Sequence, residues 1–296
     1  MDLKEEIKNR VRYIDKVVDS YLPEESGQQK TVIEAMNYSI HAGGKRVRPM
    51  LMLETFRLFD GKGESIEPFM AAMEMVHTYS LVHDDLPAMD DDEFRRGKKT
   101  THALYGEAMG VLAGDGLLNY AYEILSEALK VHQDVPKVIK AFQIFSKKAG
   151  IYGMVGGQSV DIETDNGSQI TREKLNFIYR LKTGALIESS MSIGAVLAGA
   201  DEKYQRVIEQ VAREVGLTFQ IQDDILDVTS TTETLGKPVG SDEKNNKATY
   251  VTYEGLEKAK NDVETISMQA IQKLRSLPVQ NDFLEQLLLY LIYREN

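Results

Sequence analysis

The chain has 296 residues, a formal net charge of −11 and no cysteine. The acidic balance argues against non-specific nucleic-acid binding, which depends on lysine and arginine side chains neutralising phosphates. No apolar run approaches the roughly 20 residues of a transmembrane helix, so we expect no membrane span. Residues 1–21 are charged and amphipathic, unlike a signal peptide, and with the missing cysteines this favours a cytoplasmic location.

Helix-forming residues dominate the chain, proline is scarce at 7 residues, and apolar residues recur at a helical period. The predicted fold class is therefore all-α, and Pro49 is expected to be the first residue of its helix. A break is expected near Gly184, and a single domain is predicted over 1–296 because no glycine-, serine- or proline-rich linker divides the chain. The predicted helices cover residues 4–22, 29–41, 49–60, 68–85, 103–131, 136–150, 172–200, 202–227, 255–277 and 281–293.

Two polar segments that contain glycine, residues 153–171 and 229–250, are predicted to be long loops. The first carries GGQSVD and the second carries GKPVGSD. Long loops in compact domains are often functional, so both segments are candidate parts of a site.

The stretch LVHDDLPAMDDDEFRRGKKT, residues 81–100, places six acidic residues within ten positions and follows them with four basic ones. Read alone, this pattern is equally compatible with a solvated charged turn. The preceding helix is predicted to end near Pro87. The chain then has to turn back for Asp84 and Asp90 to face the same way, because an uninterrupted helix would point them in different directions.

A second cluster, QDDILD at 222–227, follows another apolar helical segment and places Asp223 and Asp227 on one helix face. Carboxylates without cysteine or clustered histidine select hard cations, and Mg²⁺ takes one or two carboxylates together with substrate phosphates and waters. The two clusters therefore suggest a diphosphate held by Mg²⁺ between them. A two-metal nuclease or phosphatase is an alternative use of such aspartates.

The segment HAGGKRVRP, residues 41–49, places Lys45, Arg46 and Arg48 beside two glycines. Glycine permits close backbone approach to a phosphate, and arginine binds its oxygens bidentately. The segment lacks the serine or threonine of a Walker A loop and is also compatible with an ordinary basic loop. Such cations would reverse the acidic field at an anion site. Other candidate phosphate ligands are Arg95, Arg96, Lys182, Thr183, Lys237 and Lys247.

Other chemistries fit poorly. GGQSVD lacks the final glycine of a nucleophile elbow, and the 5 histidines show no HExxH spacing. His83, His102 and His132 are therefore interpreted as structural or surface residues. His77 lies seven residues before Asp84 and shares its helix face, although a buried core histidine is an alternative for it.

Together these motifs resemble the short-chain trans-prenyl diphosphate synthases, above all the bacterial members that make farnesyl diphosphate. GGKRVRP, DDLPAMD followed by RR, GQSVD, KTGAL, FQIQDDILD and GKPVGSD match in order and spacing, through essentially the whole chain. The resemblance implies a bundle of mostly antiparallel helices around a deep cavity, a homodimer and a requirement for Mg²⁺. It also implies isopentenyl diphosphate and dimethylallyl or geranyl diphosphate as substrates.

The resemblance further implies roles for matched residues. Isopentenyl diphosphate would be bound by Lys45, Arg48, His77 and Arg96. Mg²⁺ would be held by Asp84, Asp85, Asp90, Asp223, Asp224 and Asp227, with Asp84, Asp90 and Asp223 as direct ligands. The allylic diphosphate would be bound by Arg95, Lys182, Thr183, Gln220, Lys237 and Lys247, of which all but Lys247 form the implied catalytic set. Gln158 and Asp161 would serve as supports or water-mediated metal contacts, whereas the C-terminal YREN departs from the family's basic tail and leaves the role of Arg294 open.

The implied reaction ionises the allylic substrate, adds the double bond of isopentenyl diphosphate to the carbocation and then loses a proton. Ser80 lies one turn before Asp84 on the same helix face and Tyr79 lies five residues before it, so a product that grows down this helix would meet the Tyr79 ring. In the family, an aromatic residue here together with the spacing DDxxxxD goes with farnesyl diphosphate as product, although Tyr79 is also compatible with ordinary core packing.

Three alternatives use similar motifs. A geranylgeranyl or longer-chain synthase would differ only in product length. A terpene cyclase is disfavoured because it needs no second diphosphate site such as GGKRVRP. A regulatory or inactive subunit of a two-component synthase is disfavoured because both aspartate clusters are present.

Overall fold

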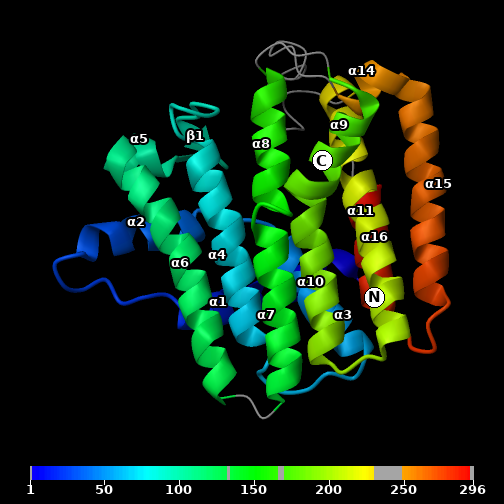
Figure 1. Cartoon of the computed structure of the whole chain (residues 1–296), viewed down its shortest axis with the longest axis horizontal. Coiled ribbons are helices and arrows are strands. Elements are labelled where there is room, and N and C mark those ends of the chain that lie inside the picture. Colours follow the sequence, from blue (N-terminus) through cyan, green and yellow to red (C-terminus); the bar gives the residue numbers. More distant parts are fainter. Residues whose placement is uncertain (1, 132–133, 166–169, 230–248, 294–296) are drawn as a thin grey trace. The chain divides into compact units, whose positions relative to one another are not determined.

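The computed structural model describes residues 2–131, 134–165, 170–229 and 249–293. These residues are almost entirely helical (Figure 1), which confirms the predicted all-α class. They divide into two compact units, one of residues 1–53 and 62–139 and the other of residues 54–61 and 140–296. The helices α3 (Val47–Leu58) and α7 (Val135–Ala149) contribute residues to both. A single domain over the whole chain stays a prediction.

The first unit is built around the helix α4 (Glu67–Asp84), which is buried on nearly all sides. Its other elements are α1 (Leu3–Ser20), α2 (Lys30–His41), β1 (Phe94–Arg95), β2 (Lys98–Lys99), α5 (Thr101–Tyr105) and α6 (Glu107–Val131). α4 packs alongside α6 (Figure 1), and its sequence is apolar almost all round, as expected for a core helix. The two strands pair antiparallel in a short hairpin directly after the first aspartate cluster.

The second unit contains α8 (Met154–Asp165), α9 (Arg172–Ile178), the π-helical turn η1 (Tyr179–Thr183), α10 (Gly184–Leu197), α11 (Glu202–Thr229), α14 (Tyr250–Glu254), α15 (Leu256–Arg275) and α16 (Asp282–Ile292). All residues of α10 are buried, and many of them are small. A Cβ added to Gly216 would lie 2.9 Å from the Cα of Gly184, so α10 and α11 approach most closely where two glycines meet.

Most predicted helices are confirmed within a few residues, and the expected break near Gly184 is the turn η1. The loop predicted over 153–171 was wrong over most of its length, because α8 occupies 154–165. Gly157 serves close packing and does not interrupt the helix, since a Cβ on it would lie 2.2 Å from the backbone nitrogen of Lys182. Most of the other predicted loop, 229–250, lies outside the described residues.

Three smaller features also differ from expectation. The helix α3 begins at Val47, so Pro49 is its third residue, where a missing N–H still costs no helical hydrogen bond. The predicted helix over 103–131 is divided at Gly106, whose φ of 90° ends α5. The hairpin at Phe94–Lys99 was not predicted, because strands of two residues are too short to show an alternation of apolar and polar residues.

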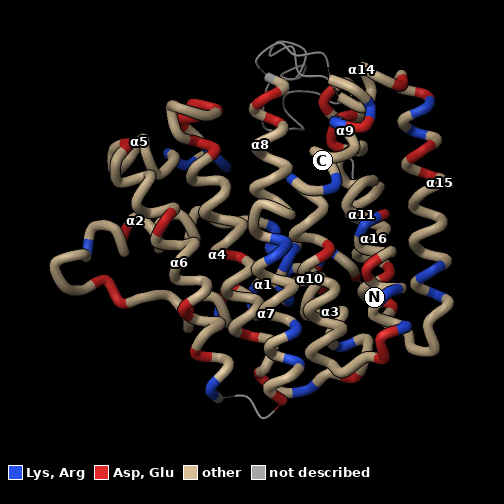
Figure 2. The backbone as a smooth tube through the Cα atoms, in the orientation of Figure 1, with Lys and Arg blue, Asp and Glu red and all other residues tan. Residues whose placement is uncertain are grey.

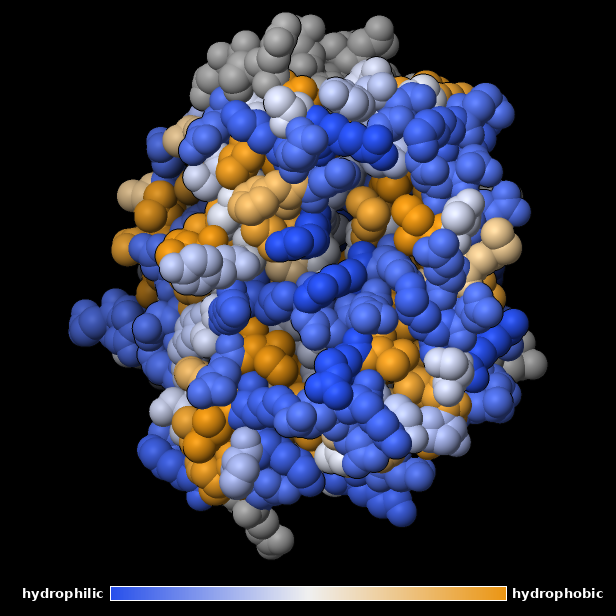
Figure 3. Space-filling view, turned by 45° about the vertical axis from the view of Figure 1, so that its right-hand side comes forward, coloured by the Kyte–Doolittle hydropathy of each residue, from blue (hydrophilic) through white to orange (hydrophobic). Residues whose placement is uncertain are grey.

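No helix in the described ranges is long and apolar enough to cross a membrane. The face drawn in Figure 3 is mostly hydrophilic, with its hydrophobic side chains in separate groups. Scattered apolar side chains are normal on a protein surface.

Candidate functional site

In the first unit, the aspartates gather where α4 ends (Figure 2). Asp84 is the last residue of the helix, and the backbone N–H of Asp90 donates to the carbonyl of Asp84 at 2.9 Å. The N–H of Met89 donates to the carbonyl of Leu86 at 2.8 Å within the same turn. The predicted reversal of the chain is therefore confirmed. Asp84 is half-buried and Asp90 is exposed.

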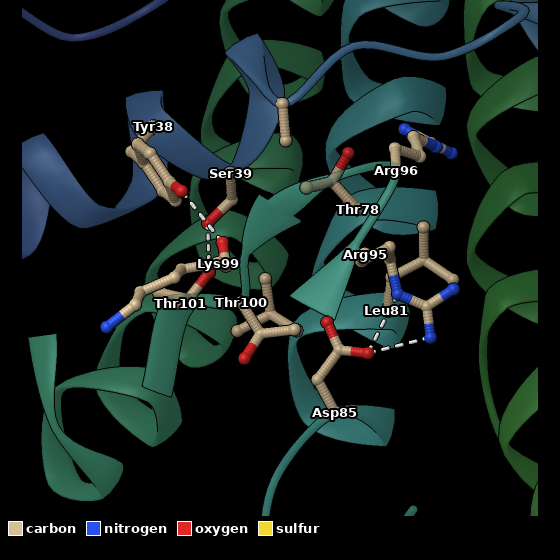
Figure 4. Close-up of a pocket in the computed structure, with 12 residues that line it drawn as sticks. Tyr38, Ser39, Thr78, Leu81, Asp85, Arg95, Arg96, Lys99, Thr100 and Thr101 are labelled. Carbon is tan, nitrogen blue, oxygen red and sulfur yellow. Dashed lines mark hydrogen bonds and ion pairs between the residues drawn. The ribbon is translucent and has the colours of Figure 1, made fainter. Parts of the chain in front are cut away.

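The neighbouring Asp85 is buried and bound to Arg95. Both Nε and Nη2 of Arg95 lie 2.7 Å from Oδ1 of Asp85 (Figure 4). Burial raises the pKa of Asp85, and the guanidinium of Arg95 opposes that rise. This ion pair links β1 to the C-terminal end of α4. Because Asp85 holds the guanidinium at two nitrogens, it orients Arg95 in the first unit.

Hydroxyl groups fasten the other strand of the hairpin and the start of α5 to α2. The Tyr38 hydroxyl donates to the carbonyl of Lys99 at 2.7 Å, and the hydroxyls of Ser39 and Thr101 lie 2.7 Å apart (Figure 4). These contacts line a small pocket that Arg95 and Arg96 also border. The placement of both arginines therefore follows from the packing of the hairpin on α2 and α4.

Arg48, His77 and Arg96 form a group in the first unit that we call the cationic cluster. Nη1 of Arg48 lies 3.2 Å from Nε2 of His77. Burial, and then the charges of Arg48 and Arg96, hold the pKa of His77 well below its usual value. His77 is therefore neutral, and Nε2 accepts from Arg48 because a guanidinium can only donate.

Positive charge in the cationic cluster is not fully compensated. Nε of Arg48 is buried and has no hydrogen-bond partner within the described ranges. Arg96 packs against Gly44, whose added Cβ would lie 2.8 Å from its Nη1, and no described carboxylate lies within ion-pairing distance of it. Burial lowers the pKa of Arg48 to about 10, so it is still a cation at neutral pH. A buried, unpaired donor beside two positive charges is suited to an anionic ligand.

In the second unit, the turn η1 carries Lys182 and Thr183. Nζ of Lys182 lies 2.5 Å from Oδ2 of Asp161 on α8, and the Thr183 hydroxyl donates to Oε1 of Gln220 on α11 at 2.8 Å. Departures from α-helical geometry of this kind occur often at functional sites. The structure thus brings together four residues that sequence analysis singled out, and it gives Asp161 the role of supporting Lys182.

The aspartates of α11 differ sharply in their surroundings. Asp223 is exposed, whereas Asp224 is 4% and Asp227 3% exposed. Asp224 accepts a hydrogen bond from the Tyr179 hydroxyl, and the backbone N–H of Tyr250 donates to its Oδ2 at 2.7 Å. Asp224 therefore joins α11, η1 and α14. Sequence analysis overlooked Tyr179, although its place three residues before Lys182 was a usable signal.

Within the part of the chain that the structure describes, no three acidic or histidine side chains converge to hold a metal ion by themselves. Two clusters of carboxylates without thiol or imidazole ligands still fit Mg²⁺, which commonly takes few protein ligands and completes its shell with phosphates and waters. The proposed phosphate ligands Lys237 and Lys247, together with His132 and Arg294, lie outside the described residues.

Replacing Gly157 by alanine is expected to destabilise the protein by about 2 kcal/mol and to lower activity, because the new Cβ would press α8 against the backbone of η1. Thermal unfolding and turnover would measure both effects. Gly116→Ala is a matched control, since the nearest atoms to its Cβ would belong to the flexible side chain of Met36, with the sulfur at 2.7 Å, and not to backbone. Equal tolerance of both substitutions would contradict a close contact at Gly157.

Comparisons with known proteins agree with the resemblance. The family model described as polyprenyl synthetase matches residues 29–283. The chain is 45% identical to a farnesyl diphosphate synthase from Geobacillus stearothermophilus, over 83% of this chain and 82% of that protein. It is 43% identical to a geranylgeranyl diphosphate synthase from Cyanophora paradoxa, over 84% and 82%.

Solved structures give the same result. A geranyltransferase from Helicobacter pylori, crystallised in complex with magnesium and isoprenyl diphosphate, superimposes with a TM-score of 0.83 and is 30% identical. The match covers 99% of this chain and 97% of that one. The similarity therefore extends through nearly the whole length of both chains.

Proposed function

We propose that this chain, which belongs to the polyprenyl synthetase family, makes farnesyl diphosphate from isopentenyl diphosphate and dimethylallyl or geranyl diphosphate. It is a prenyl diphosphate synthase, and the proposal concerns its product, its Mg²⁺ requirement and the roles of its residues. The cationic cluster carries the proposal, because an uncompensated positive site is what a diphosphate requires on a protein of net charge −11.

In this proposal, Lys45, Arg48, His77 and Arg96 bind the diphosphate of isopentenyl diphosphate. Arg48 and Arg96 supply charge and directional donors. Neutral His77 accepts from Arg48 through Nε2, which leaves its proton on Nδ1 as a further donor. The cluster thereby orients the substrate whose double bond acts as the nucleophile.

The allylic diphosphate is assigned to Arg95, Lys182, Thr183, Gln220, Lys237 and Lys247. Asp85 and Asp161 orient Arg95 and Lys182 through the ion pairs described above. Gln158 stays a proposed supporting residue. Positioned cations and hydroxyls of this kind favour departure of a diphosphate, because they meet the negative charge that develops on its oxygens.

For Mg²⁺, we propose Asp84, Asp90 and Asp223 as direct ligands. The buried contacts of Asp85 and Asp224 favour indirect roles for these two, and Asp227 is assigned with them. When bound, Mg²⁺ would supply Lewis-acid stabilisation of the leaving diphosphate. The Helicobacter geranyltransferase, whose structure is in complex with magnesium, supports a Mg²⁺ requirement for this chain.

The reaction then needs little further chemistry from the chain. The allylic C–O bond breaks, the double bond of isopentenyl diphosphate forms the new C–C bond, and the proton lost from the adduct goes to the released diphosphate. Apolar walls are required to exclude water, which would otherwise quench the cation.

Tyr79 is the residue that favours farnesyl diphosphate over a longer product. It is 6% exposed in α4, and its ring centroid lies 5.7 Å from that of His83 in an edge-on arrangement. Burial raises the pKa of Tyr79 to about 12, so the hydroxyl stays neutral. It lies roughly 7.5 Å before Asp84 along the helix axis, on the proposed path of a tail held at the aspartates. Ser80 is also assigned to chain length, although its hydroxyl already donates to the carbonyl of His77.

Tyr79→Ala is expected to lengthen the product to geranylgeranyl diphosphate or beyond, because it removes a buried ring on the proposed path of the tail. The substitution should also cost about 3 kcal/mol of stability. Chromatography of the dephosphorylated products measures chain length, and Tyr79→Phe is the matched control because it keeps the ring. A Tyr79→Ala variant that is active and still stops at farnesyl diphosphate would assign chain length to another residue.

A homodimer in the cytoplasm completes the proposal. In the first unit, Leu104, Val111 and Leu112 leave 39–52% of their surface exposed on α5 and α6. In the second unit, Ile151 and Tyr152 are 68% and 72% exposed. Exposed apolar residues of this kind are suited to a subunit interface, and sedimentation equilibrium would test it.

Incubation with Mg²⁺, isopentenyl diphosphate and dimethylallyl diphosphate, followed by identification of the product, tests the proposed function. Farnesyl diphosphate is expected. Geranylgeranyl or longer product would favour the alternative synthase, for which the Cyanophora relative provides a precedent. Failure to consume isopentenyl diphosphate would contradict the proposal and favour a regulatory subunit.

A further inference from the structure

The basic segment 41–49 contains an arginine whose side chain is already occupied. Arg46 donates from Nε to Oδ1 of Asp15 at 2.8 Å, from Nη1 to Oε1 of Glu74 at 2.7 Å and from Nη2 to the carbonyl of Ile40 at 2.9 Å. Its side chain is 5% exposed. Arg46 thus ties the segment to α1, α2 and α4 within the first unit, unlike Arg48, which has an unpaired buried Nε.

The backbone at Arg46 requires this anchoring. Its φ of 48° lies in the left-handed region, which side chains with a Cβ adopt at an energetic cost. Such a conformation persists only where the surroundings hold it in place. Because Arg48 follows two residues later, the conformation at Arg46 sets the direction from which Arg48 approaches His77.

Arg46 also neutralises the charge of the buried Glu74. Glu74 is 2% exposed, and its Oε2 has no hydrogen-bond partner among the residues described. It lies on α4 one turn before His77, and its negative charge acts on Arg48 and Arg96 as well as on Arg46. A buried carboxylate deprived of its partner is strongly unfavourable, so without Arg46 it would recruit the nearest available cation.

We propose that Arg46 is a positioning residue that engages Glu74 and holds the backbone of segment 41–49, which leaves Arg48 and Arg96 available to a diphosphate. Arg46 itself does not touch the substrate. The assignment rests on the proposed function in one respect, since it takes the cationic cluster as the isopentenyl diphosphate site.

Arg46→Met removes the partner of Glu74 and is expected to raise the KM for isopentenyl diphosphate about tenfold or more. An effect of this size corresponds to the loss of one charge-assisted hydrogen bond. The KM for geranyl diphosphate should change far less. Adding Glu74→Gln removes the unpaired charge, so the double variant should recover much of the lost affinity. Arg46→Lys keeps the charge without the fork and should fall between wild type and Arg46→Met.

Lys148→Met is a control in the second unit for loss of a cation beside a buried carboxylate. Nζ of Lys148 lies 2.5 Å from Glu188, a carboxylate with the same 2% exposure as Glu74, and Nη2 of Arg213 lies 3.3 Å from the same oxygen. Because Glu188 keeps Arg213, loss of Lys148 should lower the melting temperature only modestly and should not separate the two KM values. Equal rises in both KM values for Arg46→Met, or no recovery in the double variant, would overturn the positioning role.

Calorimetric binding of inorganic diphosphate without Mg²⁺ separates this inference from the proposed function. Weaker binding by Arg46→Met and recovery in the double variant would support the positioning role even if the wild-type protein made no prenyl product. Unchanged binding in a folded Arg46→Met protein would overturn the role even if the wild-type protein made farnesyl diphosphate. Circular dichroism of each variant establishes that the protein is folded.

Discussion

Asp84→Ala and Asp223→Ala are each expected to lower turnover by several orders of magnitude, because each removes a proposed Mg²⁺ ligand and no packing group. Asp84 is half-buried at the end of α4 and Asp223 is exposed on α11, so the helical fold should persist. Steady-state kinetics measures turnover, and far-ultraviolet circular dichroism measures helix content. An excess of chelator should reproduce both losses in the wild-type protein.

Asp91→Asn is the matched control for these variants. Asp91 is exposed within the same cluster and has a φ of 53°, a conformation that asparagine tolerates. Its substitution should leave turnover nearly unchanged. Near-normal turnover in Asp84→Ala, in Asp223→Ala or in excess chelator would contradict the proposed role of Mg²⁺.

Arg48→Ala is expected to weaken the binding of isopentenyl diphosphate by about 2 kcal/mol, which corresponds to a roughly thirtyfold higher KM. The binding of the allylic substrate should weaken much less. Arg48 holds His77 and presents the buried unpaired Nε, and the proposed allylic ligands include neither residue. Initial rates with each substrate varied in turn measure the two KM values. Arg57→Ala, on the same helix but paired with Glu54, is the control. Equal loss for both substrates would count against the assignment of the cationic cluster.

Much of the fold could be predicted because helices several turns long leave a clear 3.6-residue period. The location of α8 could not, because Gly156 and Gly157 are equally typical of a loop and of a helix packed closely on another backbone. Whether glycine ends a helix or lets it approach a neighbour depends on a contact with Lys182, which is far along the chain.

The motifs of the candidate site could be predicted from the sequence, but the burial and the partners of each side chain could not. Asp223 and Asp224 are adjacent in the sequence, yet one is exposed and the other buried, because successive residues of a helix point about 100° apart. Likewise, Arg46 and Arg48 look alike in HAGGKRVRP. Only the fold brings Asp15 and Glu74 to Arg46 and gives these two arginines different roles.

The turn η1 limits the number of residues that can connect α9 to α10. The N–H of Gly184 donates to the carbonyl of Tyr179, five residues back, so one extra residue is accommodated between α9 and α10. Deleting one residue would allow regular winding but would rotate everything that follows by about 100°. Lys182, within η1, contacts Asp161, and Gly184, directly after η1, contacts Gly216. Both contacts therefore depend on the extra residue in this turn. We therefore expect a one-residue insertion or deletion here to disrupt at least one of these two contacts.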